Sequence, residues 1–391
     1  MGKEHAGDMP LTGVTVLEMG SSVAGPYGAR ILRDMGARVF KVEYPEGGDA
    51  SRAWGPEALH GTTAAYQCMN RGKDSITVDM KDPADCEALR RFILEAVDVV
   101  IQNLRPGTAD AFGLGADLLL EHKPSLVYCD SGSYGARGPM ARLPGYDPLM
   151  QGLSGIADAT GEAGGGPCRV GPPVIDLGTG MWSAMGILAA LYRRALTGRG
   201  GKVQTSLYET AVGFMTLQSA LYHATGELPK REGLRGPMIA PNGGYVCADG
   251  TLVIVCATES QFTRLCEVID APELLGDPRF ASAGSRNRHH DVFSKALSAV
   301  LQPHPRAHWA RLLDAANIPN SPVLSLSEML AHEQTAATGI LQEAPDGDFP
   351  VVGLPVEIDG RRRPFDRYAP ELGEADAVLA PYRGDAAREG S

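Results

Sequence analysis

The stretch GVTVLEMGSSVAGPYGARILRDMGARVFKVEY, residues 13–44, decides the fold class. Its first part, GVTVLEM (13–19), has the apolar, β-branched character of a buried strand, and ARVFKVEY (37–44) has the same character. Between them, a glycine-rich turn leads into a predicted helix within 21–36. The stretch therefore predicts a β-turn-α-β unit.

The alternation of strand and helix continues along the chain. SITVDM (75–80), VDVVIQN (97–103) and SLVYCDSGS (125–133) are predicted strands, with a predicted helix over 83–96. This pattern favours an α/β protein with a Rossmann-like, doubly wound parallel sheet, in which ligands bind beyond the carboxyl ends of the strands. The first turn, SSVAGPYG, lacks the G-x-G-x-x-G spacing, so the fingerprint of nicotinamide dinucleotide binding is missing.

The length of 391 residues exceeds what one hydrophobic core usually organises, so we expect two domains. A stretch rich in proline, glycine and charge, 227–244, is predicted to be a linker. We expect a large domain over 1–226 and an inserted, smaller α+β domain over 245–325. The remainder, 326–391, is predicted to be a second linker and a return to the large domain.

Composition excludes several classes of partner. The net charge of −11 disfavours nucleic acid, because phosphate binding needs a basic face. Seven cysteines without CxxC spacing and nine scattered histidines predict no metal site. The longest apolar run, Met181–Tyr192, is too short to span a bilayer, and the N-terminus lacks the apolar core of a signal peptide. We therefore expect a cytoplasmic protein with reduced thiols and no membrane partner.

One carboxylate stands out in the apolar stretch VGPPVIDLGTGM, residues 170–181. Asp176 lies among valines, prolines and glycines, and the apolar run MWSAMGILAALY follows. A carboxylate that folding buries must be paired, hydrogen-bonded or used in chemistry. The Gly-Thr-Gly after Asp176 allows backbone amides to approach closely. The residues alone leave these alternatives open.

Five blocks of the sequence carry a resemblance to a known family. They are PLTGVTVLEMGSSVAGPYGARILRDMGARVFKVEYPEGGD (10–49), NRGKDSITVDMKDP (70–83), QNLRPGTADAFGLG (102–115), PGYDPLMQGLSGIADATGE (144–162) and VIDLGTGMWSAMGILAALYRRALTGRGGKV (174–203). In order, and over nearly the whole chain, they resemble the family III CoA-transferases, the group of formyl-CoA transferase, carnitinyl-CoA transferase and 2-methylacyl-CoA racemase. The resemblance implies two domains joined by linkers and an interlocked homodimer. It also implies no tightly bound cofactor, with coenzyme A or acyl-CoA and a carboxylic acid as substrates.

The resemblance further implies that Asp176 is the nucleophile. Attack of its carboxylate on a thioester gives a mixed anhydride, and the released thiolate then forms an aspartyl-CoA thioester, so the activation of the thioester is kept. Amides of Gly178 and Gly180, or of GEAGGGP (161–167), are candidate donors to the tetrahedral species, and the latter segment is alternatively a lid. The alternative role for Asp176 is to cap a helix that starts near Gly180, whose positive end would also keep the carboxylate ionised.

The family's contacts with CoA correspond to six residues of this chain. Lys81 and Arg105 would bind phosphates, although both are alternatively solvated surface charges. Tyr44 and Ala111 occupy positions at which relatives carry arginines, so we expect the contacts with the nucleotide of CoA to differ in detail. The six residues are Val23, Ala24, Val78, Lys81, Asn103 and Arg105.

The triplet Gly145-Tyr146-Asp147 departs from the GHD sequence of the family's racemases. A tyrosine with a pKa of about 10 is a poor base for an α-proton, so transfer is favoured over racemisation. Tyr146 is predicted either to pack or to line the acyl pocket, and Asp147 to bind substrate or to orient its loop. Two alternatives remain: a 2-methylacyl-CoA racemase or epimerase, and a non-catalytic acyl-CoA-binding protein.

Overall fold

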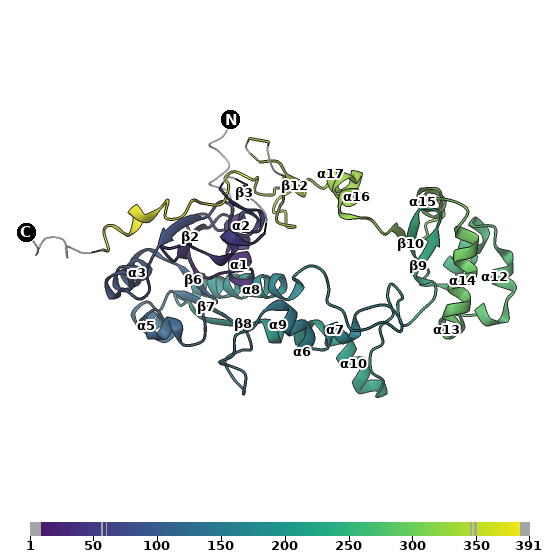
Figure 1. Cartoon of the computed structure of the whole chain (residues 1–391), viewed down its shortest axis with the longest axis horizontal. Coiled ribbons are helices and arrows are strands. Elements are labelled where there is room, and N and C mark those ends of the chain that lie inside the picture. Colours follow the sequence, from purple (N-terminus) through teal and green to yellow (C-terminus); the bar gives the residue numbers. More distant parts are fainter. Residues whose placement is uncertain (1–8, 56–57, 60, 345, 348–349, 384–391) are drawn as a thin grey trace, which may run out of the picture. The chain divides into compact units, whose positions relative to one another are not determined.

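In the computed structural model, which describes residues 9–55, 58–59, 61–344, 346–347 and 350–383, the chain divides into two compact units (Figure 1). Unit 1 contains the described residues of 1–156, 169–227 and 338–391. Unit 2 contains 157–168 and 228–337. The second unit is thus inserted into the first at two places in the chain.

Unit 1 is built on a six-stranded sheet in which every pairing is parallel. The prediction of a doubly wound parallel sheet is confirmed, because the chain builds outward from β1 first in one direction and then, from β6, in the other. The strands, in spatial order, are β5 (Asp74–Thr77), β2 (Arg38–Glu43), β1 (Thr15–Met19), β6 (Val99–Gln102), β7 (Val127–Gly132) and β8 (Gly201–Ser206).

Two layers of helices cover the sheet because apolar residues point alternately to its two faces. Val16 packs with helices α1 (Ala24–Asp34) and α8 (Val174–Thr197), whereas the adjacent Leu17 packs with α3 (Pro83–Ala96) and α5 (Ala116–His122). Figure 1 shows these two pairs of helices on opposite faces of the sheet. Almost every strand residue in the centre is therefore buried, as the continuous apolar runs in the sequence predict.

Shorter elements complete unit 1. They lie in the segments between and after the main strands and helices. They are β3 (Ala58–Leu59), β4 (Thr62–Thr63), α2 (Ala64–Asn70), α4 (Thr108–Ala111), α6 (Asp147–Leu153), α7 (Ile156–Ala159), α9 (Leu207–Phe214), α10 (Thr216–Thr225), β12 (Leu341–Gln342), β13 (Val351–Val352) and the 3-10 helices Ala50–Ala53 and Asp376–Leu379, with α7 running into unit 2.

Helix α8, at 24 residues, is longer than the predicted apolar run, and by length and composition it could cross a membrane. Its side chains Ala184, Ile187 and Ala190 are instead buried against the sheet of unit 1. A buried core helix of a globular protein passes the same test of length and composition. We therefore interpret α8 as a core helix.

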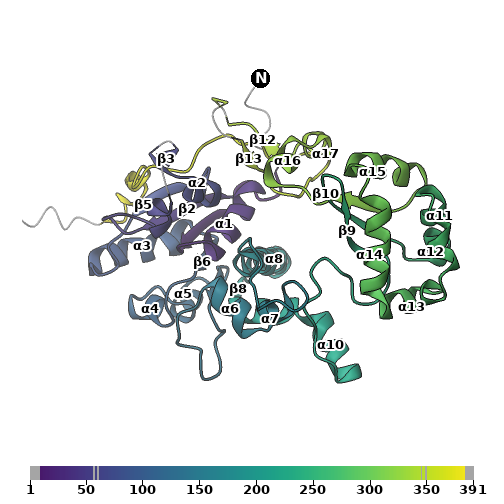
Figure 2. The same cartoon turned by 45° about the vertical axis from the view of Figure 1, so that its right-hand side comes forward.

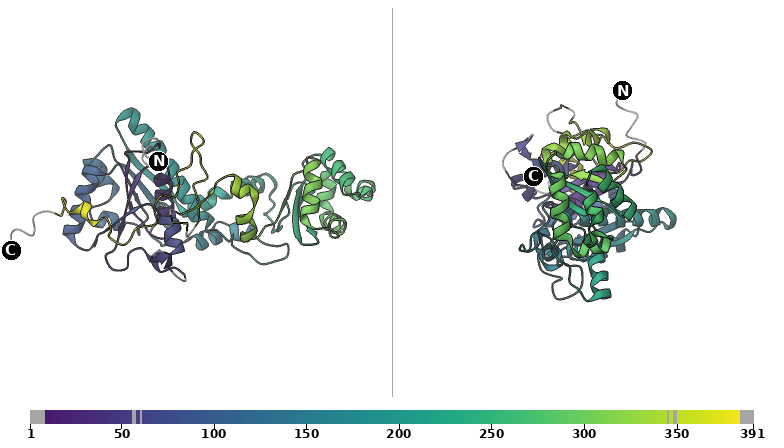
Figure 3. Two further views of the ribbon diagram at one scale, coloured as in Figure 1. Left: turned by 90° about the horizontal axis from the view of Figure 1, so that it is seen from above. Right: turned by 90° about the vertical axis from the view of Figure 1, so that its right-hand side faces the viewer.

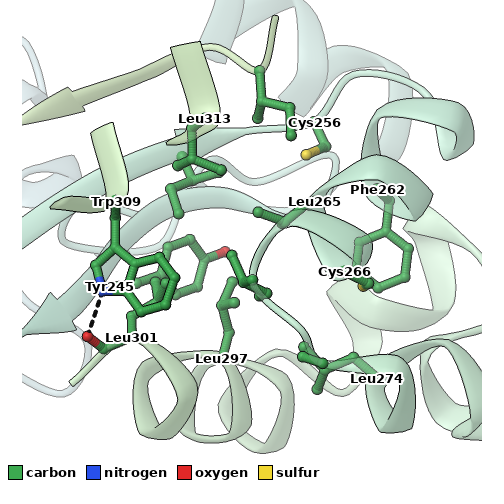
Figure 4. Packing of buried hydrophobic residues seen from close by; sticks show 14 of the residues in the cluster. Tyr245, Cys256, Phe262, Leu265, Cys266, Leu274, Leu297, Leu301, Trp309 and Leu313 are labelled. Atoms are coloured by element: carbon green, nitrogen blue, oxygen red, sulfur yellow. Dashed lines mark hydrogen bonds between the residues drawn. The ribbon is translucent and has the colours of Figure 1, made fainter. Parts of the chain in front are cut away.

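Unit 2 contains a three-stranded antiparallel sheet and a set of helices packed on it (Figure 3). Its core contains Tyr245, Phe293 and Trp309, and the Trp309 Nε1 donates to the Leu301 carbonyl at 2.7 Å (Figure 4). The elements are β9 (Asn242–Cys247), β10 (Gly250–Val255), β11 (Asn320–Pro322), α11 (Glu259–Val268), α12 (Pro272–Gly276), α13 (Ala283–Arg288), α14 (His290–Leu301), α15 (Arg306–Ala315), α16 (Leu326–Ala331), α17 (Glu333–Ala337) and the 3-10 helix Pro278–Phe280.

The glycine-rich segment 157–168 is predicted within the large domain, whereas its contacts group it with unit 2. Arg231 explains the difference, because its guanidinium donates to the Gly165 carbonyl and to the Asp158 carboxylate. The amide of Gly233 also donates to the Gly161 carbonyl at 2.8 Å. Unit 2 likewise extends to Ala337, beyond the predicted boundary at 325.

A buried ionic cluster joins the strands of unit 1 to the turn after β1. The Glu18 carboxylate accepts from Lys41 Nζ at 2.9 Å and from Lys73 Nζ at 2.7 Å, and all three side chains are fully buried. Lys41 also donates to the Gly20 carbonyl, and Lys73 donates to the Pro26 carbonyl. The cluster therefore holds both ends of the turn that leads into α1.

Removing one charge of this cluster should destabilise unit 1. Lys73→Met leaves the Glu18 carboxylate with one cation and leaves two further acceptors, on Pro26 and Asn70, without their donor. We expect the free energy of unfolding to fall by about 3 kcal/mol, the cost of breaking a buried pair from one side. Urea denaturation followed by circular dichroism measures it, with the exposed Lys295→Met as the matched control, expected within about 0.5 kcal/mol of wild type.

Candidate functional site

The candidate site lies where the sheet changes its winding direction, between the carboxyl ends of β1 and β6. At this point Asn103, after β6, binds the backbone of Ser21, after β1: its Oδ1 accepts from the Ser21 amide and its Nδ2 donates to the Ser21 carbonyl, both at 2.9 Å. The Asn103 side chain thus pairs with both the amide and the carbonyl of Ser21, as the backbone of a neighbouring strand would. The predicted CoA contact at Asn103 has its side-chain amide already bonded to this turn.

Helices α1 and α8 approach each other closely beside this turn (Figure 2). A side-chain carbon at Gly180 would lie 2.8 Å from the Ala24 carbonyl oxygen and 3.0 Å from the Gly28 nitrogen. Only glycine fits such a contact. Ala24 and Ile175 accordingly share one apolar cluster with Met150 of α6, so the first turns of three helices meet at the carboxyl edge of the sheet.

Asp176 lies within the first turn of α8, because the helix begins at Val174 and not near Gly180 as the sequence predicts. Its own carboxylate does not cap the helix. Asp147 takes that place, since its Oδ2 accepts from the amides of Ile175 at 2.8 Å and of Asp176 at 3.3 Å. The alternative role of Asp176 as a helix cap is therefore wrong.

Gln151 completes the support of this turn, and the sequence analysis missed it. Its Nε2 donates to Asp147 Oδ1, and its Oε1 accepts from the Val170 amide at 2.8 Å. Both Asp147 and Gln151 are buried. The available signal was the spacing, because an amide four residues after an acid lies on the same face of a helix. Asp147 therefore holds the first turn of α8, and Gln151 holds the loop before it.

The Asp176 carboxylate is partly buried and accepts no hydrogen bond from any residue that the structure describes. Burial, and then the nearby charge of Asp147, raise its pKa from the ordinary 3.8 to about 7. The helix end was expected to keep the carboxylate ionised, but the amides there are directed to Asp147 instead. Asp176 is thus an unpartnered carboxylate whose charge is costly and whose basicity is high.

The amides of α8 are not available to a bound carbonyl oxygen. The first four, from Val174 to Leu177, donate to Pro172, Asp147 and Pro173. Gly178 and Gly180, both predicted as donors, lie inside the helix, where glycine allows contact with Phe214 and with α1. In contrast, the amides of Val23, Ala24 and Gly25 at the start of α1 donate to no described residue.

The other predicted CoA contacts lie at separate places on unit 1. Val78 is buried in the core between the sheet and α3, so only its backbone could reach a ligand. Arg105 is exposed in the loop after β6, beyond the carboxyl edge of the sheet. Lys81 lines a cavity of about 230 Å³ together with Ala111 and Arg90.

Tyr146 precedes α6 and is 62% exposed, so it does not pack in the core of its own chain. Its neighbour Asp147 is only 3% exposed. Tyr44, at the end of β2, is also exposed. Of these predicted residues, the structure brings Asp147, Asp176 and Ala24 together, whereas Val78 lies in a different apolar cluster.

Comparisons with known proteins agree over nearly the whole chain. A family model described as CoA-transferase family III matches residues 11–376. The chain is 37% identical to the acetyl-CoA:oxalate CoA-transferase of Acetobacter aceti over 372 residues, 95% of each chain. It is 35% identical to the succinate–glutarate CoA-transferase of Agrobacterium fabrum, again over 95% of each. A crystal structure of a CAIB/BAIF family protein from Brucella suis superposes with a TM-score of 0.86 at 33% identity, covering 96% of this chain and all of that one.

The raised pKa of Asp176 predicts how an uncharged variant changes stability with pH. Between the unfolded pKa of 3.8 and the folded pKa of about 7, the native state binds more protons, so wild-type stability falls as the pH rises through this window. Asp176→Asn removes this loss. We expect the variant to be more stable than wild type by about 1 to 3 kcal/mol at pH 8, with the gain disappearing towards pH 4.

Denaturation curves measured across this pH range test the expectation. Asp117→Asn is the matched control, because Asp117 is an exposed acid in the first turn of α5. The Asp117→Asn variant should be less stable than wild type by a few tenths of a kcal/mol at pH 8, because it loses a negative charge that interacts favourably with the helix N-terminus. Equal responses of the two variants to pH would contradict the assigned environment of Asp176.

Proposed function

Because the chain belongs to CoA-transferase family III, we propose that it moves CoA from an acyl-CoA donor to a free carboxylic acid through covalent intermediates on Asp176. The family resemblance of the sequence is confirmed by the matches to the family model and to named CoA-transferases. The activity class follows from the family. The route through Asp176, the acids exchanged and the assembly are our proposals.

The environment of Asp176 is the observation that carries the proposed route. A nucleophile must keep its oxygen lone pairs free, and the Asp176 carboxylate accepts no hydrogen bond from the described residues. Its backbone is meanwhile held by Asp147 and by the first turn of α8. A fixed backbone with an unbonded, basic carboxylate supports a role in attack on a carbonyl group.

The proposed reaction runs through four acyl transfers. Asp176 attacks the thioester carbonyl, the C–S bond breaks, and CoA leaves as a thiolate, so that a mixed anhydride of Asp176 and the donor acyl group remains. The thiolate attacks the aspartyl carbonyl, which releases the donor acid and leaves an aspartyl-CoA thioester. An acceptor carboxylate attacks this thioester, which releases the thiolate again and leaves a second mixed anhydride, between Asp176 and the acceptor acid. The thiolate then attacks the acceptor carbonyl, which gives the new acyl-CoA and restores Asp176.

The start of α1 is our candidate for the group that stabilises the oxyanions. The amides of Val23, Ala24 and Gly25 lie at the N-terminal end of α1, where the helix dipole is positive, and donate to no described residue. Gly180, one turn after Asp176, contacts Ala24 directly. Backbone donors of this kind stabilise the negative oxygen of a tetrahedral species. The predicted CoA contacts at Val23 and Ala24 fit this placement.

The exchanged acids are proposed from the relatives. The names of the relatives include oxalate, succinate, glutarate, mesaconate and D-citramalate, which are small dicarboxylic acids, and one of them pairs oxalate with acetyl-CoA. We propose a small dicarboxylic acid as donor, acceptor or both. We also propose a cytoplasmic location, which the seven free cysteines support.

We propose that the protein is a homodimer, interlocked as the family resemblance implies. Helix α10 supports this proposal, because none of its ten residues is buried in its own chain although Leu217, Leu221 and Tyr222 are apolar. Met181 and Met185 of α8 are also more than half exposed. A helix without Asp, Glu, Lys or Arg that exposes apolar side chains to this extent is typical of an interface between obligate subunits.

Asp176→Asn tests the catalytic proposal. We expect the variant to keep its fold and its affinity for CoA, because the amide is nearly isosteric, and to lose transfer by several orders of magnitude. Incubation of wild type with succinyl-CoA and then hydroxylamine should modify the peptide spanning 170–193, since both intermediates are activated carbonyls. Mass spectrometry of that peptide and an assay with candidate acids measure the two outcomes.

Asp117→Asn is the matched control and should transfer CoA at the wild-type rate. An unmodified peptide together with full activity of Asp176→Asn would refute the route. The racemase alternative is tested in deuterated water without an acceptor acid. Incorporation of α-deuterium under that condition would indicate racemisation, whereas its absence, with transfer once an acid is added, supports the transferase.

The dimer prediction is tested by sedimentation equilibrium. We expect twice the chain mass at all concentrations, because interlocked chains do not separate on dilution. Leu217→Glu, on α10, should reduce the yield of folded dimer, since a buried unpaired charge is costly. Leu228→Glu is the matched control, because Leu228 is an exposed leucine outside α10. A well-folded monomer in wild type would overturn the prediction.

A further inference from the structure

Unit 1 has a second polar cavity at the opposite edge of its sheet from Asp176. The cavity has a volume of about 390 Å³. Two of its lining residues, Arg38 and Asp74, are the first residues of β2 and β5. It therefore opens at the amino ends of these strands, whereas the candidate CoA site lies beyond the carboxyl ends. Neither the resemblance nor the proposed reaction uses this cavity.

The charges lining the cavity are predominantly positive. Four arginines face two carboxylates, which leaves an excess of two positive charges in the lining. Each carboxylate is shared, because Asp74 accepts from Arg38 and Arg367, while Asp366 pairs with Arg33 and Arg363. Two acids outside the lining, Asp34 and Glu374, form longer ion pairs with Arg33 and Arg367, both at 3.5 Å.

Several guanidinium donors in this cavity are unused. Arg33 is 3% exposed, and its Nη1 is a buried nitrogen without a hydrogen-bond partner among the described residues. In Arg38, only Nε donates to a described residue, the Asp74 carboxylate at 2.8 Å. Its two terminal nitrogens donate to none. Gly72 leaves the space for Arg33, since a side-chain carbon there would lie 2.1 Å from the guanidinium.

We propose that this cavity binds a phosphate group, either as free inorganic phosphate or as a small phosphate monoester. A phosphate carries a charge of about −1.5 to −2 at neutral pH, of the sign that complements a lining in which arginines outnumber carboxylates, although Asp34 and Glu374 offset part of that excess from 3.5 Å. Its oxygens are strong acceptors for guanidinium groups that converge from different directions. The buried Arg33 Nη1 makes no hydrogen bond and has only the Asp34 carboxylate at 3.5 Å, so a phosphate would offer it a closer acceptor.

Isothermal titration calorimetry with the full-length protein tests this site. Inorganic phosphate and glycerol 3-phosphate are titrated separately, at constant ionic strength maintained with sodium chloride. We expect saturable binding of at least one of them with a Kd of about 1 mM or tighter. Arg38→Gln removes an exposed guanidinium group and no buried charge, and it should weaken this binding by about ten-fold. Tighter binding of the monoester identifies an ester as the preferred source of the phosphate group, and the reverse identifies the free ion.

Arg279→Gln is the matched control, because Arg279 also binds an aspartate through Nε and also lies over a phenylalanine ring, but in unit 2. Its binding of phosphate should equal that of wild type. Arg105→Ala distinguishes this cavity from the proposed CoA site and should leave phosphate binding unchanged while weakening that of CoA. The proposal is overturned if wild type binds neither probe, if Arg38→Gln binds as tightly as wild type, or if Arg105→Ala abolishes the binding.

Discussion

The buried carboxylate of Glu18 sets a condition on which unit 1 depends. A charge inside a sheet is tolerated only when opposite charges and hydrogen bonds surround it. Lys41 and Lys73 meet this condition, and each of them also bonds a carbonyl of the turn into α1. Although burial opposes its charge, the surrounding carboxylates raise the pKa of Lys41, whereas burial dominates at Lys73 and lowers its pKa to about 8. The turn at the candidate site is thus tied to the interior of the sheet.

Asp176 shows the opposite solution to the same physical problem. Its carboxylate is partly buried without a cation, so the cost of its charge appears as a raised pKa rather than as an ion pair. Asp147 contributes twice, because it takes the helix amides that could have stabilised Asp176 and it adds a negative charge nearby. Such an arrangement lowers stability at neutral pH, which is typical of groups retained for chemistry.

Close packing of glycine brings the two halves of the site together. Because Gly28 and Gly180 lack side chains, α1 and α8 pack closely, with Gly180 against the Ala24 carbonyl oxygen and the Gly28 backbone. Bulkier residues there would separate the candidate oxyanion donors from the candidate nucleophile. The same sheet offers its other edge, at the amino ends of β2 and β5, to an arginine-lined cavity, so the two edges present different chemistry.

The order of strands and helices in unit 1 could be predicted from the sequence, because apolar periodicity is a local signal, and an acid among glycines and prolines was enough to single out Asp176 as a candidate. Asp147 was also visible as an acid near the site. Its cap of α8, the bond of Gln151 to Val170 and the pairing of Asn103 with Ser21 were decided only by the tertiary structure. Each of these contacts joins residues that the fold, and not their neighbours in sequence, brings within hydrogen-bonding distance. The sequence analysis placed the start of α8 near Gly180, whereas the helix begins at Val174. The reason is the same, because a cap supplied by a residue distant in sequence leaves no signal beside the helix.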